Sequence, residues 1–320
     1  MLLLKARYAK EHMEEKLFRV LCLDGGGAKG FYTLGILREI ETLIGCKLYE
    51  RFDLIYGTST GSIIGSLLGL GKSVREIIEL YQEHVPTVMK STNRTQRTVA
   101  LTDLQKVIFG DATFEAMATN VGVVTAKWML HEPMIFKTNI NQAFGLKESF
   151  VPGFGVRVGD AVQASCSAYP YFDRKNVVTS KGDSIELIDG GFCANNPTLY
   201  ALGDALVSMK NEPARVRVVS LGCGSYPTPA AKWWTLDYWI EQTPGVQLLQ
   251  KTLEINTASM ERLRTLLYAQ VPTVRINQAF SEPAMATDLF EHNLAKLNIL
   301  TQRGTQSFAE NEQALRQFLL

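Results

Sequence analysis

Three short apolar segments of this sequence each end in a glycine-rich loop: LFRVLCLDGGG (17–27), FDLIYGTSTG (52–61) and SIELIDGG (184–191). A short, mostly apolar run that ends in glycines is typical of a buried strand. Helical patterns follow these strands, and such alternation favours a mostly parallel sheet with helices on both faces. Loops at the carboxyl ends of the strands meet in such a sheet, so we expect the three glycine loops to converge.

The rest of the chain continues the alternation. Helices are predicted over 28–45, 60–71 and 73–85, the last with a capping box formed by Ser73 and Glu76. The polar stretch 90–98 is predicted to be a mobile loop that precedes a helix. Further strands are expected at 121–130, 134–139 and 214–224, with helices at 157–168 and 196–209. The pattern of the last hundred residues predicts mainly helices. We therefore divide the chain into a catalytic core (17–224) and a C-terminal part (225–320) packed on the same domain. The C-terminal part is a candidate lid or regulatory region.

The middle loop, GTSTG, matches the pattern G-x-S-x-G between a strand and a helix. In that context the serine occupies a tight turn that exposes its hydroxyl, and a side chain at Gly57 or Gly61 would collide with neighbouring backbone. The helix that follows also directs its positive end toward the serine. These features predict that Ser59 is a nucleophile; the plain alternative is a structural strand–helix turn with a capping serine.

The first loop permits two chemistries. Gly25, Gly27 and Gly30 fit the dinucleotide fingerprint G-x-G-x-x-G after a strand. No acidic residue closes the second strand, however, so the expected ribose contact has no good candidate. The alternative is an oxyanion hole, in which backbone N–H groups of Gly25, Gly26 and Gly27 stabilise a tetrahedral acyl intermediate.

A serine nucleophile needs a base, and none of the four histidines lies beside a glycine loop. Asp189 does, at the end of the buried strand in LIDGG. Burial raises the pKa of a carboxyl group, which lets its ionised form accept the serine proton directly. The plain alternative for Asp189 is a turn residue that caps the following loop.

The motifs DGGGAKG, GTSTG and DGG, in this order, resemble the patatin-like phospholipase family, and ASCSAYPYF (164–172) and CANNP (193–197) extend the resemblance over roughly 19–224. The resemblance implies a three-layer α/β/α patatin-like fold with a mostly parallel central sheet. It implies a dyad of Ser59 and Asp189 without histidine, which hydrolyses fatty-acyl esters of membrane phospholipids through an acyl-serine, with no metal or other cofactor. It assigns the oxyanion hole to three glycines of the first loop, Gly25, Gly26 and Gly27. The remaining motif glycines have supporting structural roles: Gly30, Gly57, Gly61, Gly190 and Gly191.

The motif set also resembles the patatin-like effectors of bacterial antiphage (CBASS-type) systems, which cyclic oligonucleotides switch on. This resemblance implies a cyclic-oligonucleotide activator, peripheral contact with phospholipid at the inner face of the cell membrane, and homo-oligomer formation on activation. Lys90, Arg94 and Arg97 in KSTNRTQRT are candidate phosphate contacts, although a solvated surface loop is the simpler interpretation. Lys29, before the last glycine of the first motif, is expected to lie solvated, with a phosphate head group as the alternative contact.

Composition limits the remaining options. A formal net charge of +1 provides no global field for a DNA or RNA polymer. The five cysteines lack CxxC spacing, which argues against a zinc site or a disulfide framework. No apolar run is long enough to span a bilayer and no signal peptide is evident, so we expect a cytoplasmic protein.

Two rival functions remain open. One is an α/β-hydrolase esterase whose triad is Ser59, Asp189 and His292, which have the right order in the chain. The other is a nucleotide-binding module that uses the first glycine loop without hydrolysis. Separately, the segment KWWTLDYWIEQ (232–242) holds an aromatic cluster suited either to membrane contact or to core packing, formed by Trp233, Trp234 and Trp239.

Overall fold

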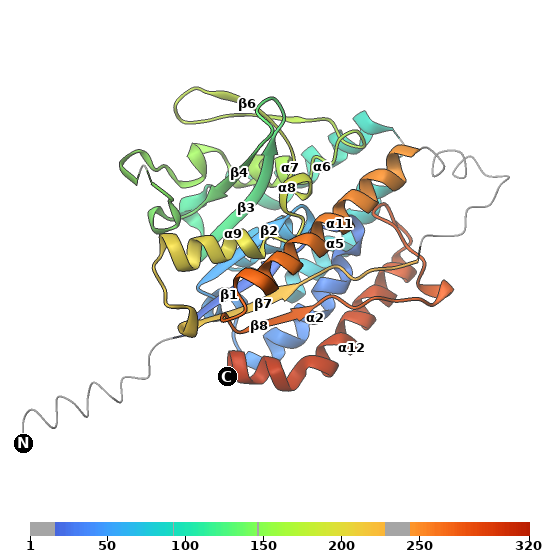
Figure 1. Ribbon diagram of the computed structural model, residues 1–320. Coiled ribbons are helices and arrows are strands. Elements are labelled where there is room, and N and C mark those ends of the chain that lie inside the picture. The colour runs from blue at the N-terminus through green and yellow to red at the C-terminus, as the bar shows by residue number, and fades with distance from the viewer. Residues whose placement is uncertain (1–16, 92, 146, 228–243) are drawn as a thin grey trace, which may run out of the picture.

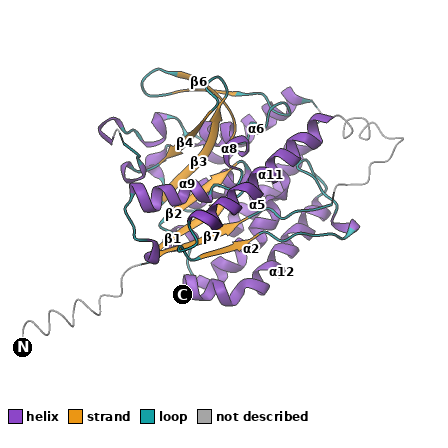
Figure 2. Cartoon of the chain, in the orientation of Figure 1, coloured by secondary structure: helices purple, strands orange, loops and turns teal. Residues whose placement is uncertain are grey.

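The structure is a computed structural model that describes residues 17–91, 93–145, 147–227 and 244–320. A twisted sheet lies between two layers of helices (Figures 1 and 2). The eight strands that the structure describes are ordered β5-β6-β3-β2-β1-β7-β8, with β4 paired to β3 outside this path. Their bounds are β1 (Phe18–Leu23), β2 (Leu54–Thr58), β3 (Asn120–Lys127), β4 (Glu132–Lys137), β5 (Lys175–Val178), β6 (Ser184–Asp189), β7 (Val216–Leu221) and β8 (Thr273–Ile276).

The sheet is mostly parallel at its centre and antiparallel at one edge. Strands β3, β2, β1, β7 and β8 run parallel to one another. Strands β4 and β6 both pair antiparallel with β3, and β5 pairs antiparallel with β6. The predicted three-layer fold with a mostly parallel sheet is therefore confirmed.

Helices cover both faces of the sheet because the central strands are buried on both sides. The principal helices are α2 (Gly30–Ile44), α4 (Thr60–Gly69), α5 (Val74–Lys90), α6 (Arg94–Phe109), α7 (Val158–Ser165), α8 (Gly191–Ala194), α9 (Thr198–Leu202), α11 (Pro244–Leu267) and α12 (Leu294–Leu319). Alternate residues of β1 enter different cores: Leu21 and Leu23 pack with α2, α4 and α5, whereas Val20 and Cys22 pack with α8 and α9. The strands thus link two apolar layers.

The C-terminal part is built into the same sheet and helix layer. Helix α12 crosses α2 closely, since a Cβ at Gly35 would lie 2.1 Å from the Thr301 carbonyl oxygen and one at Gly304 would lie 2.1 Å from that of Tyr32. The helical character predicted for this part agrees with α11 and α12. The sequence analysis missed β8, which extends the sheet beside β7.

One predicted loop is wrong. The stretch predicted to be mobile contains the end of α5 at Lys90 and the start of α6 at Arg94. Asn93 begins α6, because its side chain accepts a hydrogen bond from the Thr95 N–H. The predicted capping box of Ser73 and Glu76 is confirmed.

Two further points concern membrane contact. The helices that the structure describes include none that is both long and apolar enough to cross a bilayer. The aromatic cluster of Trp233, Trp234 and Trp239 lies outside the described residues.

Candidate active site

Ser59 sits on a strained turn between β2 and α4. Its backbone angles are φ 51° and ψ −124°, which side-chain-bearing residues rarely adopt. The turn is tight: a Cβ at Gly57 would lie 2.2 Å from the Gly61 carbonyl oxygen, and one at Gly61 would lie 2.2 Å from the Leu23 carbonyl oxygen. Both positions therefore require glycine, as the sequence predicted. This backbone strain costs of order 1–3 kcal/mol, and the turn places the Ser59 hydroxyl clear of the sheet.

A buried serine that the sequence analysis did not single out fixes this turn. The Ser59 N–H donates to Ser165 Oγ at 2.9 Å, and the Ser165 hydroxyl donates to the Val124 carbonyl oxygen at 2.6 Å. The nucleophile is thereby tied to β3 through a side chain on α7. Ser165 belongs to the ASCSAYPYF motif, which was the available signal, but its partner is 106 residues away along the chain.

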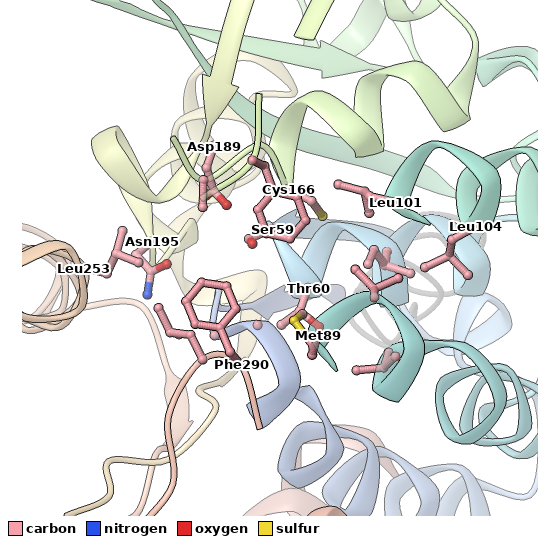
Figure 3. A pocket seen from close by; sticks show the side chains of 18 residues that line it. Ser59, Thr60, Met89, Leu101, Leu104, Cys166, Asp189, Asn195, Leu253 and Phe290 are labelled. Carbon is pink, nitrogen blue, oxygen red and sulfur yellow. The ribbon is translucent and has the colours of Figure 1, made fainter. Parts of the chain in front are cut away.

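Strand register brings Asp189 to Ser59. On β3, Val124 pairs with Thr58, the last residue of β2, and the next residue, Thr125, pairs with Asp189, the last residue of β6. Strands β2 and β6, which run in opposite directions, thus end beside neighbouring residues of β3. The convergence expected for the second and third glycine loops follows, and Figure 3 shows the two side chains in the wall of one pocket.

Asp189 has the electrostatics of a base that works near neutral pH. The side chain is 2% exposed, and its Oδ1 accepts a hydrogen bond of 2.7 Å from the Gly191 N–H. Burial raises the pKa of Asp189 to about 7, against the opposing effects of the Gly191 N–H and the Ser59 side chain. A carboxyl group with this pKa can both accept and return a proton at physiological pH.

The first glycine loop supplies two backbone donors rather than three. The Gly25 N–H donates to the Asn195 carbonyl oxygen at 3.0 Å, so the prediction that Gly25 belongs to the oxyanion hole is wrong. Gly26 and Gly27 line the pocket beside Ser59, and within the described part of the chain their N–H groups have no acceptor. The loop approaches its neighbours closely, since a Cβ at Gly26 would lie 2.5 Å from the Cys223 side chain. Gly26 and Gly27 therefore remain the candidate oxyanion-hole donors of this loop.

The supporting glycines also lie in crowded positions. A Cβ at Gly30 would lie 2.5 Å from Thr60 Oγ1, one at Gly190 would lie 2.1 Å from the Val124 carbonyl oxygen, and one at Gly191 would lie 2.7 Å from the Leu253 side chain. Their predicted structural roles agree with this packing.

The pocket behind the dyad is mostly apolar and narrow. Its volume is about 60 Å³, room for only a few water-sized groups. Apolar side chains from α4, α5, α6, α11 and the loop before α12 line it, among them Ile63, Val85, Val88, Met89, Leu101, Leu104, Leu253, Leu289 and Phe290. Leu249, Leu253 and Leu289 form a small buried cluster, two of whose members line the pocket, and we call it the lid cluster. The pocket thus has the chemistry to hold an acyl chain but not the space.

The predicted ligand-contact residues do not line the catalytic pocket, and two of them, Arg94 and Arg97, are engaged within the protein. Arg94 Nε lies 2.7 Å from Asp173 Oδ1. Arg97 donates to the Ser91 carbonyl oxygen, and its guanidinium lies 4.4 Å from the centre of the Phe290 ring. These contacts hold α6 in place, and Lys90 is exposed at the end of α5.

Two other side chains depart from simple expectations. Lys29, expected to be solvated, is only 4% exposed; its Nζ lies 3.8 Å from Glu254 Oε1 and 5.8 Å from the centre of the Tyr226 ring. His292 is exposed, its Nδ1 lies 3.3 Å from the Phe290 carbonyl oxygen, and it does not line the pocket of Ser59 and Asp189. The geometry favours a dyad over the triad.

No group of three or more His, Cys, Asp or Glu side chains suited to a metal ion occurs among the described residues. The chemistry available to the site is thus nucleophilic attack by a serine, proton transfer to a carboxylate, and stabilisation of an oxyanion by backbone N–H groups.

The chain is similar to patatin-like phospholipases. The model of the family described as patatin-like phospholipase matches residues 21–202. A cUMP-AMP-activated phospholipase from Escherichia coli is 55% identical over 317 residues, which are 97% of this chain and 96% of that protein. A cGAMP-activated phospholipase from Vibrio cholerae is 29% identical over 233 residues, 65% of this chain and 63% of that protein. Among solved structures, VipD from Legionella pneumophila aligns with 95% of this chain and 67% of its own, at 13% identity and a TM-score of 0.48.

Proposed function

The chain belongs to the patatin-like phospholipase family, and on that premise we propose that it hydrolyses fatty-acyl esters of membrane phospholipids with Ser59 as nucleophile and Asp189 as base. The protein is a carboxylic ester hydrolase of the lipid acyl hydrolase type. The observation that carries the residue assignment is the strained turn of Ser59 beside a buried carboxyl group whose pKa is about 7.

The reaction proceeds through a covalent acyl-enzyme. Asp189 accepts the hydroxyl proton of Ser59 as Oγ attacks the ester carbonyl carbon, and the N–H groups of Gly26 and Gly27 stabilise the resulting oxyanion. When the tetrahedral intermediate collapses, the C–O bond to the lysophospholipid breaks and its oxygen takes the proton from Asp189. Asp189 then deprotonates a water molecule, whose oxygen attacks the carbonyl carbon of the acyl-serine. The C–O bond to Ser59 breaks, Ser59 Oγ takes the proton back from Asp189, and the fatty acid leaves.

We propose further that a cyclic dinucleotide activates the enzyme in antiphage defence, in the cytoplasm at the inner face of the cell membrane, with assembly into a homo-oligomer. The names of the E. coli and V. cholerae relatives support the nucleotide. The catalytic pocket supports a need for activation, because about 60 Å³ cannot hold an acyl chain although the dyad is in place. A ligand that binds the open arrangement better than the closed one shifts the population toward activity.

The test is fatty-acid release from phospholipid vesicles at several protein concentrations, with each of a panel of cyclic di- and trinucleotides added in turn. We expect negligible release without nucleotide, strong release with one cyclic dinucleotide, and no release from Ser59→Ala or Asp189→Asn protein. His292→Ala is the matched control and should retain activity; its inactivation would favour the triad. Full activity of the wild type without nucleotide would contradict the activation, and substantial activity of either dyad variant would contradict the mechanism.

A further inference from the structure

A second pocket, polar and much larger, adjoins the catalytic pocket. Its volume is about 520 Å³, within the range typical of small-molecule sites. The two pockets share Asn195 and the first glycine loop, which contributes Gly26 and Gly27 to the catalytic pocket and Gly25 and Lys29 to the polar one. We call it the polar pocket. Its other lining residues come from β8, from the loops that follow β1, β7 and β8, and from one side of α11, namely Asp24, Cys223, Gly224, Ser225, Glu254, Thr257, Ala258, Glu261, Arg262, Thr265, Arg275 and Asn277.

Most charges in the polar pocket already have partners. Arg275 forms a bidentate pair with the buried Asp24, with Nη1 2.9 Å from Oδ1 and Nη2 2.5 Å from Oδ2. Glu261 Oε1 accepts a hydrogen bond of 2.6 Å from Arg264. The charges of these side chains are therefore paired within the protein. Glu254 and two cations are the other charged side chains that line the pocket.

The two remaining cations are Lys29 and Arg262. Lys29 is 4% exposed, yet its ammonium group donates no hydrogen bond to any described residue, and its nearest carboxylate oxygen, from Glu254, is 3.8 Å away. A buried ammonium group without hydrogen-bond acceptors is costly, so this position favours an added anion. Arg262 lies exposed on α11 with no ion-pair partner in the described part of the chain. Glu254 is 43% exposed and can therefore turn into solvent when an anion approaches Lys29.

We propose that the polar pocket binds the cyclic dinucleotide activator, with its phosphodiester groups at Lys29 and Arg262. This inference rests on the proposed activation and adds its site. Cyclic dinucleotides carry two phosphodiester anions, matched by the two cations that donate no hydrogen bond to a carboxylate, and two bases whose polar edges suit the side chains of Asn277 and Ser225. The apolar catalytic pocket offers no such groups beyond the dyad and Asn195.

The position of the polar pocket couples the ligand to catalysis. Lys29 ends the short helical turn η1 (Gly27–Lys29), which directly follows Gly26 of the oxyanion hole. Glu254 follows Leu253, which lines the catalytic pocket, and α11 packs against α8 in front of the sheet in Figure 1. A phosphodiester that replaces Glu254 at Lys29 therefore acts on the first glycine loop and on the helix that carries Leu249 and Leu253 of the lid cluster. An activator must bind the protein more tightly when α11 is in its active position than when α11 is in its resting position.

The decisive experiment measures binding separately from hydrolysis. Calorimetric titrations use Ser59→Ala protein as the background, with cUMP-AMP, cGAMP, inorganic phosphate and glycerophosphoglycerol as separate probes. Ala258→Trp fills the polar pocket without removing a polar group, and Ser259→Trp, on the adjacent exposed residue that does not line the pocket, is the matched control. We expect about tenfold or greater weakening of cyclic dinucleotide binding by Ala258→Trp, and affinity within about twofold of the parent for Ser259→Trp.

Charge variants test the named contacts independently. Lys29→Met should weaken binding about tenfold or more, because a charge-assisted hydrogen bond is lost. Glu254→Gln should strengthen binding several-fold, because the competing carboxylate is removed; a merely structural role of Glu254 predicts no gain. Arg316→Ala, on the exposed face of α12, is the control and should bind as the parent does.

The outcomes separate this site from the proposed function. Nucleotide-activated hydrolysis by the wild type, together with unchanged binding by both Ala258→Trp and Lys29→Met, would overturn the polar pocket while leaving the function intact. Nucleotide binding that Ala258→Trp abolishes, in a wild type that releases no fatty acid, would support the site and contradict the function. Binding of glycerophosphoglycerol but of neither cyclic dinucleotide would identify a lipid head-group site and overturn the proposal.

Discussion

Replacing Asp189 by asparagine should abolish turnover and, above pH 7, make the protein more stable. Burial raises the pKa of Asp189 from 3.8 to about 7 in the folded protein. This difference of about 3 pH units corresponds to roughly 4 kcal/mol of free energy that the fold loses when the carboxyl group ionises. Asparagine keeps an oxygen for the Gly191 N–H, which Asp189 Oδ1 accepts at 2.7 Å, but it never ionises.

The pH dependence gives the sign of the effect. Below pH 3.8 the carboxyl group is protonated in both the folded and the unfolded chain, and its ionisation costs no stability. Between 3.8 and about 7 the unfolded chain ionises first, so the free energy of unfolding of the wild type falls with rising pH, and above about 7 the loss is complete. The stability advantage of Asp189→Asn should therefore grow from about 1–2 kcal/mol at pH 5 to roughly 4 kcal/mol at pH 8.

Urea unfolding of both proteins at the two pH values measures this gap. Asp103→Asn, at a carboxyl group whose side chain is 66% exposed, is the control and should show no pH-dependent gain. Turnover of a soluble short-chain ester by the wild type should rise with pH through a midpoint near 7, because only the ionised carboxyl group accepts the serine proton. A stability gap that stays constant between pH 5 and pH 8, or an activity midpoint near 4, would refute the argument.

Three further variants test other parts of the site. Ser59→Gly and Ser59→Ala should both lack turnover, but Ser59→Gly should be about 1 kcal/mol more stable in urea unfolding because glycine tolerates φ 51°; equal stability would contradict the strain. Gly26→Ala should lower kcat about a hundredfold or more with KM nearly unchanged, and the reverse pattern in steady-state kinetics would favour a ground-state contact instead. Arg275→Met should destabilise the fold by about 3–5 kcal/mol by leaving Asp24 buried and unpaired, whereas adding Asp24→Asn should restore much of the loss; denaturation midpoints that show no recovery would contradict the pairing.

Sequence patterns predicted the parts of the site that depend on local geometry. Gly57, Ser59 and Gly61 lie within one turn, so their spacing alone carries the constraint that the backbone shows. Asp189 was identifiable because a strand and a glycine pair flank it. The register that places Asp189 opposite Thr125 of β3 was not, since it depends on pairing between distant strands.

Most of the incorrect predictions share a physical cause. They concern groups whose surroundings depend on residues far away along the chain. Whether the Gly25 N–H faces the pocket depends on the Asn195 carbonyl oxygen, 170 residues away along the chain. Lys29 is buried beside Glu254 of α11 and the Tyr226 ring, both far along the chain. The stretch around Arg94 is polar and lacks a clear apolar period, yet Asn93 caps a helix there. Strand β8 has only four residues, Thr273–Ile276, too few for a period to show.

Under the proposed activation, the packing of the lid cluster protects the host. Its three leucines, Leu249, Leu253 and Leu289, are each a single mutation away from a smaller side chain, while Ser59 and Asp189 already line the same pocket as Leu253 and Leu289. A variant that loosened this contact would gain a destructive activity instead of losing a useful one. Natural selection on these positions would therefore act in uninfected cells, through the death of carriers, and not only during infection.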